Sequence, residues 1–141
     1  MQYTINKMKI NSLLQNIFRI LLGAFLALAG FSHLTFNRAE FLAQVPQWVP
    51  LNPDMVVILS GIVEISLGLS LIFFLKQKRN VGILAAIFFV LVFPGNISQY
   101  INHVNAFGLN TDALRLTRLF FQPLLVLWAL WSTGVFIKSK K

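Results

Sequence analysis

The sequence predicts an all-α integral membrane protein, a bundle of four transmembrane helices with a short interfacial segment between helices 1 and 2. The 141 residues are 57% hydrophobic and 11% charged, whereas soluble domains average about 45–50% apolar and about 25% charged residues. The chain also holds four apolar segments close to the ~20 residues that cross a bilayer. We place these spans at about 13–32, 54–75, 81–100 and 113–137, within one membrane domain over residues 1–141.

Charge and cysteine content exclude several functions. The formal net charge is +8, but the basic residues cluster at the ends of the apolar spans. This arrangement is typical of membrane topology, so no nucleic-acid partner is expected. The chain has no cysteine, which excludes thiolate nucleophiles, disulfide exchange and zinc–thiolate sites. No metal site is predicted.

The first span follows a polar segment, residues 1–12, that we expect to be loose or interfacial. No small-residue cleavage site follows the span, so we expect it to remain as an anchor. Gly23, Ala27 and Gly30 share one helix face, and small residues at this spacing allow a second helix to approach closely. Arg19 is near the start of the span, where its side chain is expected to reach the lipid head groups.

The connector over residues 35–53 predicts a short helix lying over the mouth of the bundle. Asn37, followed three residues later by Glu40, is typical of a helix cap, and the helix is expected to end near Gln44. Three prolines then prevent a longer helix. Aromatic residues beside a span mark the membrane interface, so the segment is either a lid or an anchoring loop.

The second span contains the most informative residue of the chain. Glu64 is the only charged residue between positions 55 and 75, and a carboxylate at the centre of a transmembrane helix costs roughly 2.5–3.5 kcal/mol. Gly61 and Gly68 lie on the same face. This small, acidic face is therefore expected to look into the bundle rather than toward lipid.

The remaining elements follow from turn signals. The basic segment 76–80 predicts a tight turn that makes the second and third spans an antiparallel hairpin. Pro94 and Gly95 are expected to kink the third span and to free backbone carbonyl groups that need partners. Thr111 or Asp112 can cap the fourth helix.

Charge asymmetry predicts the orientation. Basic residues near span ends favour the cytoplasmic side, and the loops on the opposite side hold Glu40, Asp54 and Asp112 with only Arg38 as a strong base. Both termini are therefore expected to be cytoplasmic. The basic residues on the terminal side are Lys7, Lys9, Lys76, Lys78, Arg79, Lys138, Lys140 and Lys141.

Five polar side chains are expected to meet in the outer half of the bundle and to form a ligand-binding site. Arg118 is the expected counter-charge of Glu64. This pair could be a structural ion pair that sets helix register, or it could bind a ligand or move protons. The five residues are His33, Glu64, Asn96, Arg118 and Gln122.

The chain resembles the DoxX-like family of small four-helix bacterial membrane proteins. The matching segments come in the family's order and cover all four spans, although Gly95 stands where alanine is more usual. The segments are 29–33, 45–50, 59–69, 92–97 and 118–122. The resemblance implies location in the bacterial inner membrane and carries the five site residues over as motif positions. It also implies association with quinone-linked redox enzymes.

Two functions follow as hypotheses. The first is an accessory of a membrane redox system that binds a quinone or another small amphiphile, because an apolar bundle with a few convergent polar groups is typical of a small-molecule pocket. The alternative is a non-enzymatic scaffold or assembly chaperone for another membrane protein. A transporter is less favoured, because the inner half shows no matching polar residues. The sequence does not decide whether the protein is an enzyme. Besides the bilayer, it allows a membrane or redox protein as a partner, and it also allows a homo-oligomer.

Overall fold

The structure, a computed structural model, describes residues 1–137, and the regular structure in these residues is helical. Four of the helices are long and apolar enough to cross a membrane. The predicted all-α four-helix bundle is therefore confirmed, and the chain is a multi-pass membrane protein. The elements are α1 (Gln2–Leu34), α2 (Arg38–Gln44), α3 (Pro53–Phe73), the short 3-10 helix η1 (Leu75–Gln77), α4 (Lys78–Ile101) and α5 (Asp112–Ser132).

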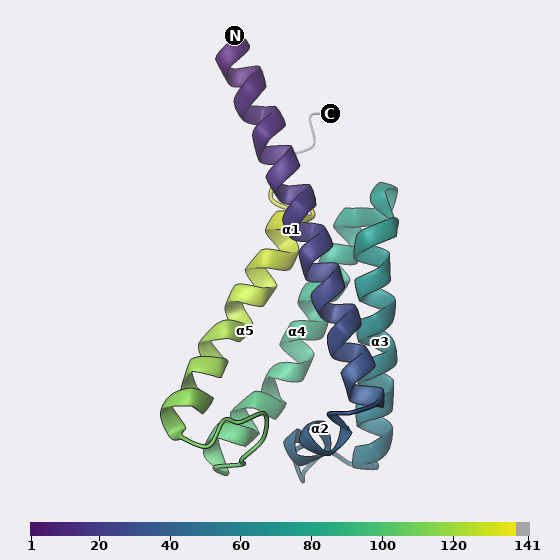
Figure 1. Cartoon of the computed structure of the whole chain (residues 1–141), viewed down its shortest axis with the longest axis vertical. Helices are drawn as coiled ribbons and strands as arrows, with labels where there is room; N and C mark the ends of the chain where they lie inside the picture. The colour runs from purple at the N-terminus through teal and green to yellow at the C-terminus, as the bar shows by residue number, and fades with distance from the viewer. Residues whose placement is uncertain (138–141) are drawn as a thin grey trace.

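The first helix is longer than predicted. Residues 1–12 were expected to be loose, but α1 begins at Gln2 and its first turns project beyond the other helices (Figure 1). This segment contains no glycine and no proline, so nothing in it interrupts a helix that has been nucleated in the membrane. The predicted span from residue 13 is the part of α1 that lies beside the other helices.

The last helix is shorter than the predicted span to residue 137. It begins as expected, because the Thr111 hydroxyl oxygen accepts a hydrogen bond from the backbone N–H of Leu114 (3.3 Å). It ends at Ser132 because Gly134 has a φ of 75°, a left-handed conformation that glycine adopts without strain. The backbone N–H groups of Gly134 and Val135 bond back to carbonyl groups of the last turn, which closes the helix.

The bundle consists of two helix pairs. The most extensive contacts join α1 to α3 and α4 to α5, as Figure 1 shows. The predicted hairpin of the second and third spans exists as a connection through η1, but α3 and α4 contact each other much less. We call the end that carries η1 and the N-terminus the terminal end. The end where α2 and the 102–111 loop lie is the connector end.

A compact apolar core joins the two pairs. Leu22 and Leu26 of α1 and Leu71 of α3 meet residues of α4 and α5, and all are 9% exposed or less. Because lipid tails are as apolar as these side chains, close packing rather than removal from water stabilises this core. The other members of the core are Val81, Ala85, Ala86, Phe88, Phe89 and Ala129.

The α1–α3 contact is made backbone to backbone at glycines, as the small-residue faces predicted. A methyl group added to Gly30 would lie 2.5 Å from the carbonyl oxygen of Gly61, and one added to Gly68 would lie 2.5 Å from that of Gly23. Both distances are too short for a carbon–oxygen contact. The two helices are therefore as close as their backbones allow.

The side chain of Arg19 points into the bundle, so the expectation that it reaches the lipid head groups is wrong. Its side chain is only 2% exposed and donates hydrogen bonds to the backbone carbonyl oxygens of Leu71 and Ile72, the latter at 3.2 Å. These carbonyls belong to the last turn of α3, where helix geometry leaves them without a partner. In a membrane such groups need an internal donor, and a cation is favoured at a helix C-terminus.

The short helix α2 confirms the predicted segment, but not its capping. Asn37 makes no side-chain capping bond. The Glu40 carboxylate instead accepts a hydrogen bond from the backbone N–H of Phe107 in the other connector (2.5 Å). Arg38 bonds Asp54 at the start of α3 (2.6 Å). Helix α2 is therefore tied to both neighbouring segments and lies across the connector end (Figure 1).

We predict that Gly30→Ala destabilises the protein and that Gly95→Ala does not. The added methyl group at Gly30 would force α1 away from α3, and overpacking of this kind costs about 1–3 kcal/mol. At Gly95 the same methyl group would approach only the Gln44 carbonyl oxygen, at 3.4 Å. Thermal unfolding in detergent should show a midpoint several degrees lower for Gly30→Ala alone. Equal shifts in the two variants would contradict the close helix contact.

Candidate functional site

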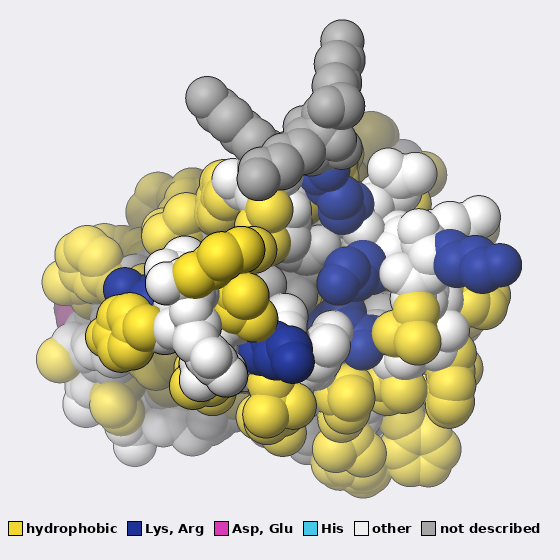
Figure 2. Space-filling view, turned by 90° about the horizontal axis from the view of Figure 1, so that it is seen from above, with side chains coloured by type: hydrophobic (Ala, Val, Ile, Leu, Met, Phe, Trp, Pro, Cys, Tyr) yellow, Lys and Arg dark blue, Asp and Glu magenta, His cyan; other side chains and the backbone are white. Residues whose placement is uncertain are grey.

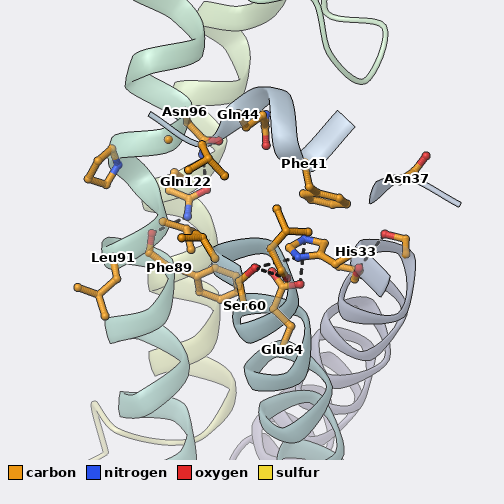
Figure 3. Close-up of a pocket in the computed structure, with 18 of the residues that line it drawn as sticks. His33, Asn37, Phe41, Gln44, Ser60, Glu64, Phe89, Leu91, Asn96 and Gln122 are labelled. Carbon is orange, nitrogen blue, oxygen red and sulfur yellow. Dashed lines mark hydrogen bonds and ion pairs between the residues drawn. The ribbon is translucent and has the colours of Figure 1, made fainter. Parts of the chain in front are cut away.

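A cavity of about 700 Å³ lies between the helix pairs at the connector end. Its walls are mainly apolar, and Phe41 and Gln44 of α2 contribute to its lining, as does Trp48 of the following loop. All five residues of the predicted site also line it, and Figure 3 labels His33, Glu64, Asn96 and Gln122 among them. The structure therefore brings His33, Glu64, Asn96, Arg118 and Gln122 to one cavity, although not as the cluster that was expected.

One polar cluster lies on the α1–α3 wall. His33 ends α1, and Ser60 and Glu64 lie one turn apart on α3. The imidazole Nε2 atom is 3.2 Å from the Glu64 Oε2 atom, and Nδ1 is 3.0 Å from the Ser60 hydroxyl oxygen (Figure 3). His33 is 5% exposed and Glu64 is 8% exposed. The expected partner of Glu64 was Arg118, and the structure places His33 there instead.

The hydrogen bonds of this cluster assign the imidazole protons. The Ser60 hydroxyl donates to the backbone carbonyl oxygen of Val57 (3.0 Å), so its oxygen is left to accept from His33. His33 therefore carries a proton on Nδ1 and turns Nε2 toward Glu64. A single further proton, on Nε2 or on the carboxyl group, makes the His33–Glu64 pair neutral overall.

The pair keeps unused hydrogen-bonding capacity. His33 Nε2 and Glu64 Oε2 are within ion-pair distance, but their angles do not make a hydrogen bond. Neither atom bonds to any other group in the part of the chain that the structure describes. A buried polar group without a partner costs about 1–3 kcal/mol. A ligand that bonds to either atom would recover this free energy.

A second polar cluster lies on the α4–α5 wall and consists of two amides. The Asn96 side chain donates to Gln122 Oε1 (3.0 Å), and the Gln122 side chain donates to the backbone carbonyl oxygen of Phe89 (2.6 Å). Phe89 precedes the turn that Pro94 interrupts, in the region where the sequence predicted carbonyl groups in need of donors. Asn96 and Gln122 are both buried, so this chain of bonds joins α4 to α5.

Arg118 stands apart from both clusters. Within residues 1–137 no carboxylate lies within 4.0 Å of its guanidinium group. It makes one long hydrogen bond to the Gln44 side-chain oxygen (3.4 Å) and lies 5.0 Å above the ring centre of Phe107. Both partners belong to the connectors. The predicted Glu64–Arg118 pair is therefore wrong, because Arg118 turns toward the connector end.

Several site residues could not be found from sequence patterns. Phe41 covers the imidazole of His33, with ring centres 3.3 Å apart. Gln44 donates to the side-chain oxygen of the fully buried Gln99 (2.6 Å) and so holds α2 against α4. The aromatic connector indicated a segment over the bundle mouth, but no periodicity identified which of its side chains face inward.

We predict that His33 and Glu64 are energetically coupled. Replacing Glu64 or His33 alone by leucine should each lower the unfolding free energy, because one buried polar group loses its neighbour, and such losses reach about 3–5 kcal/mol. The double variant should lose less than the sum of the two single changes. Denaturant unfolding of the three variants in detergent measures the difference. Additive losses would mean that the two side chains do not interact.

No curated protein and no solved structure shows significant similarity to the chain. One family model matches residues 22–133, and its description is "Domain of unknown function (DUF8561)". The match contains all five predicted site residues and omits the projecting first turns of α1. The chain therefore belongs to the DUF8561 family.

Proposed function

We propose that the protein binds a small amphiphile, in the first place a quinone, as an accessory of a membrane redox system. The observation that carries the proposal is the cavity at the connector end. It combines apolar walls with a few convergent polar groups, which is the usual composition of a small-molecule site. The resemblance to the DoxX-like family supports the link to quinones.

The arrangement of the two polar clusters suits a ring with oxygen atoms on opposite sides. The His33–Glu64 pair on the α1–α3 wall can donate or accept a proton at one oxygen. Asn96, whose side chain is already oriented by Gln122, can bond an oxygen facing the α4–α5 wall. An isoprenoid tail would lie along the apolar lining.

The packing at the terminal end of the bundle favours a closed binding pocket over a transport path. The apolar core separates the cavity from that end. Contrary to expectation, polar residues are buried there too: Gln15 donates to the Trp131 carbonyl oxygen (2.9 Å), and Thr133 donates to that of Ala129 (2.7 Å). The buried Ser132 hydroxyl group makes no hydrogen bond within the described residues. The Gln15 bond joins α1 to α5, and the core residues between this end and the cavity are apolar.

We further propose that the protein lies in the bacterial inner membrane with both termini in the cytoplasm. Lys7 and Lys9 on α1 and Lys76, Lys78 and Arg79 beside η1 belong to the terminal end, where Figure 2 shows lysine and arginine side chains gathered. Basic residues of this kind favour the cytoplasmic side. Lys138, Lys140 and Lys141, which contribute to the same asymmetry in the sequence, lie outside the described residues.

A quinone titration with two matched serine variants tests the binding site. Ser60 holds His33 in the cavity wall, whereas Ser66 is exposed on the same helix and donates to the backbone carbonyl oxygen of Ile62. A short-chain benzoquinone should quench the fluorescence of Trp48, which lines the cavity. Ser60→Ala and Glu64→Gln should weaken binding several-fold, at about 1 kcal/mol per hydrogen bond. Ser66→Ala should bind like the unmodified protein.

Two results would count against this proposal. Equal affinity in the three variants would place the quinone elsewhere. If the unmodified protein bound no quinone at all, the scaffold or assembly-chaperone function would become the better account, with the polar clusters serving only to hold the helices together.

The absence of cysteine allows a direct test of topology. Asn80 near η1 and Asn110 before α5 are both exposed, at opposite ends of the bundle. In spheroplasts, a membrane-impermeant maleimide should label Asn110→Cys, and it should label Asn80→Cys only after lysis. The reverse pattern would invert the proposed orientation.

A further inference from the structure

The chain has few carboxylates, and each of them is already engaged. It contains four acidic side chains. Glu40 accepts from the Phe107 backbone, and Glu64 lies beside His33. Asp54 bonds Arg38, and Asp112 bonds both Arg115 and His103.

Arg118 is therefore left as a cation without a carboxylate partner in the part of the chain that the structure describes. Glu64, the carboxylate in the cavity lining, lies against His33 and not against Arg118, so no carboxylate of the described residues balances the guanidinium charge. Such a charge is costly in the low-dielectric environment of a bilayer unless an anion or a strong acceptor faces it. Its long bond to Gln44 and its position over the Phe107 ring offset only part of this cost.

Arg118 can also be reached from a second side. A separate hollow of about 290 Å³, lined by Phe107, Leu109, Leu114, Thr117 and Phe121, has Arg118 in its wall as well. The guanidinium therefore belongs to the lining of both the cavity and this apolar hollow. The apolar tail of an amphiphile can therefore pack against apolar side chains on either side of the guanidinium group.

We infer that the cavity selects amphiphiles whose head group carries an anionic oxygen, and that Arg118 makes this selection. This inference rests on the proposed function and narrows it to a ligand class. An arginine fork binds a carboxylate or an enolate oxygen with two charge-assisted hydrogen bonds. Two sources share this chemistry: a hydroxyquinone whose acidic hydroxyl group is ionised, and a fatty acid.

Two ligand pairs, each differing in the charged group, test the inference. The first pair is 2-hydroxy-1,4-naphthoquinone and 1,4-naphthoquinone; the second is dodecanoate and dodecanol. Binding is measured at neutral pH with the protein in phosphatidylcholine nanodiscs. At least one anionic member should bind about tenfold or more tightly than its neutral counterpart, which corresponds to roughly 1.4 kcal/mol or more. The pair that shows the preference identifies the source.

Variants of Arg118 separate charge from shape. Arg118→Gln should abolish the preference, and Arg118→Lys should retain part of it. Arg79→Gln removes the same charge at the terminal end, where Arg79 bonds only the Val135 carbonyl oxygen among the described residues, and should keep the full preference. Size-exclusion chromatography of each variant establishes that the protein is folded.

The outcomes separate this inference from the function on which it rests. Equal binding of charged and neutral members to the unmodified protein would overturn the anion selection and leave amphiphile binding intact. A preference that survives in Arg118→Gln would also overturn it. If none of the four compounds bound, the proposed function itself would fail.

Discussion

The close contact of α1 and α3 is the constraint on which the site depends. A methyl group on Gly61 would lie 3.0 Å from both the Gly30 carbonyl oxygen and the Cβ atom of His33. The same contact that removes side-chain volume between the helices therefore brings His33 beside α3. Glu64, one turn further along α3, is then within 3.2 Å of the imidazole. Facing lipid, each of these polar side chains would be costly. The contact between the two glycine faces places them beside each other inside the bundle, which lowers that cost.

The cavity arises from the way the two helix pairs are joined. At the terminal end the pairs share an apolar core, and Arg19 satisfies the last carbonyl groups of α3. At the connector end side chains of α2 lie between the pairs, where Gln44 bonds Gln99 and Phe41 covers His33. The space that remains is apolar but has a polar cluster on each wall. A site of this kind holds a ligand by shape and orients it by a few hydrogen bonds.

Electrostatics then distinguishes the residues that line the cavity. Glu64 lies against His33, and the amides of Asn96 and Gln122 are bonded to each other. Arg118 is the member whose charge is not balanced by a carboxylate of the described chain. This is why we propose that Arg118 acts on a molecule that enters the cavity.

The sequence by itself determined the membrane class, the four spans, the small-residue faces and five of the polar residues that line the cavity. These features depend on local composition and helical periodicity, which can be read residue by residue. Partner choice was decided only by the tertiary structure. Glu64 pairs with His33 and not with Arg118, and Arg19 bonds α3 rather than head groups, because these partners come from different helices. Which one lies nearer depends on the rotation and spacing of packed helices, and periodicity carries no information about either.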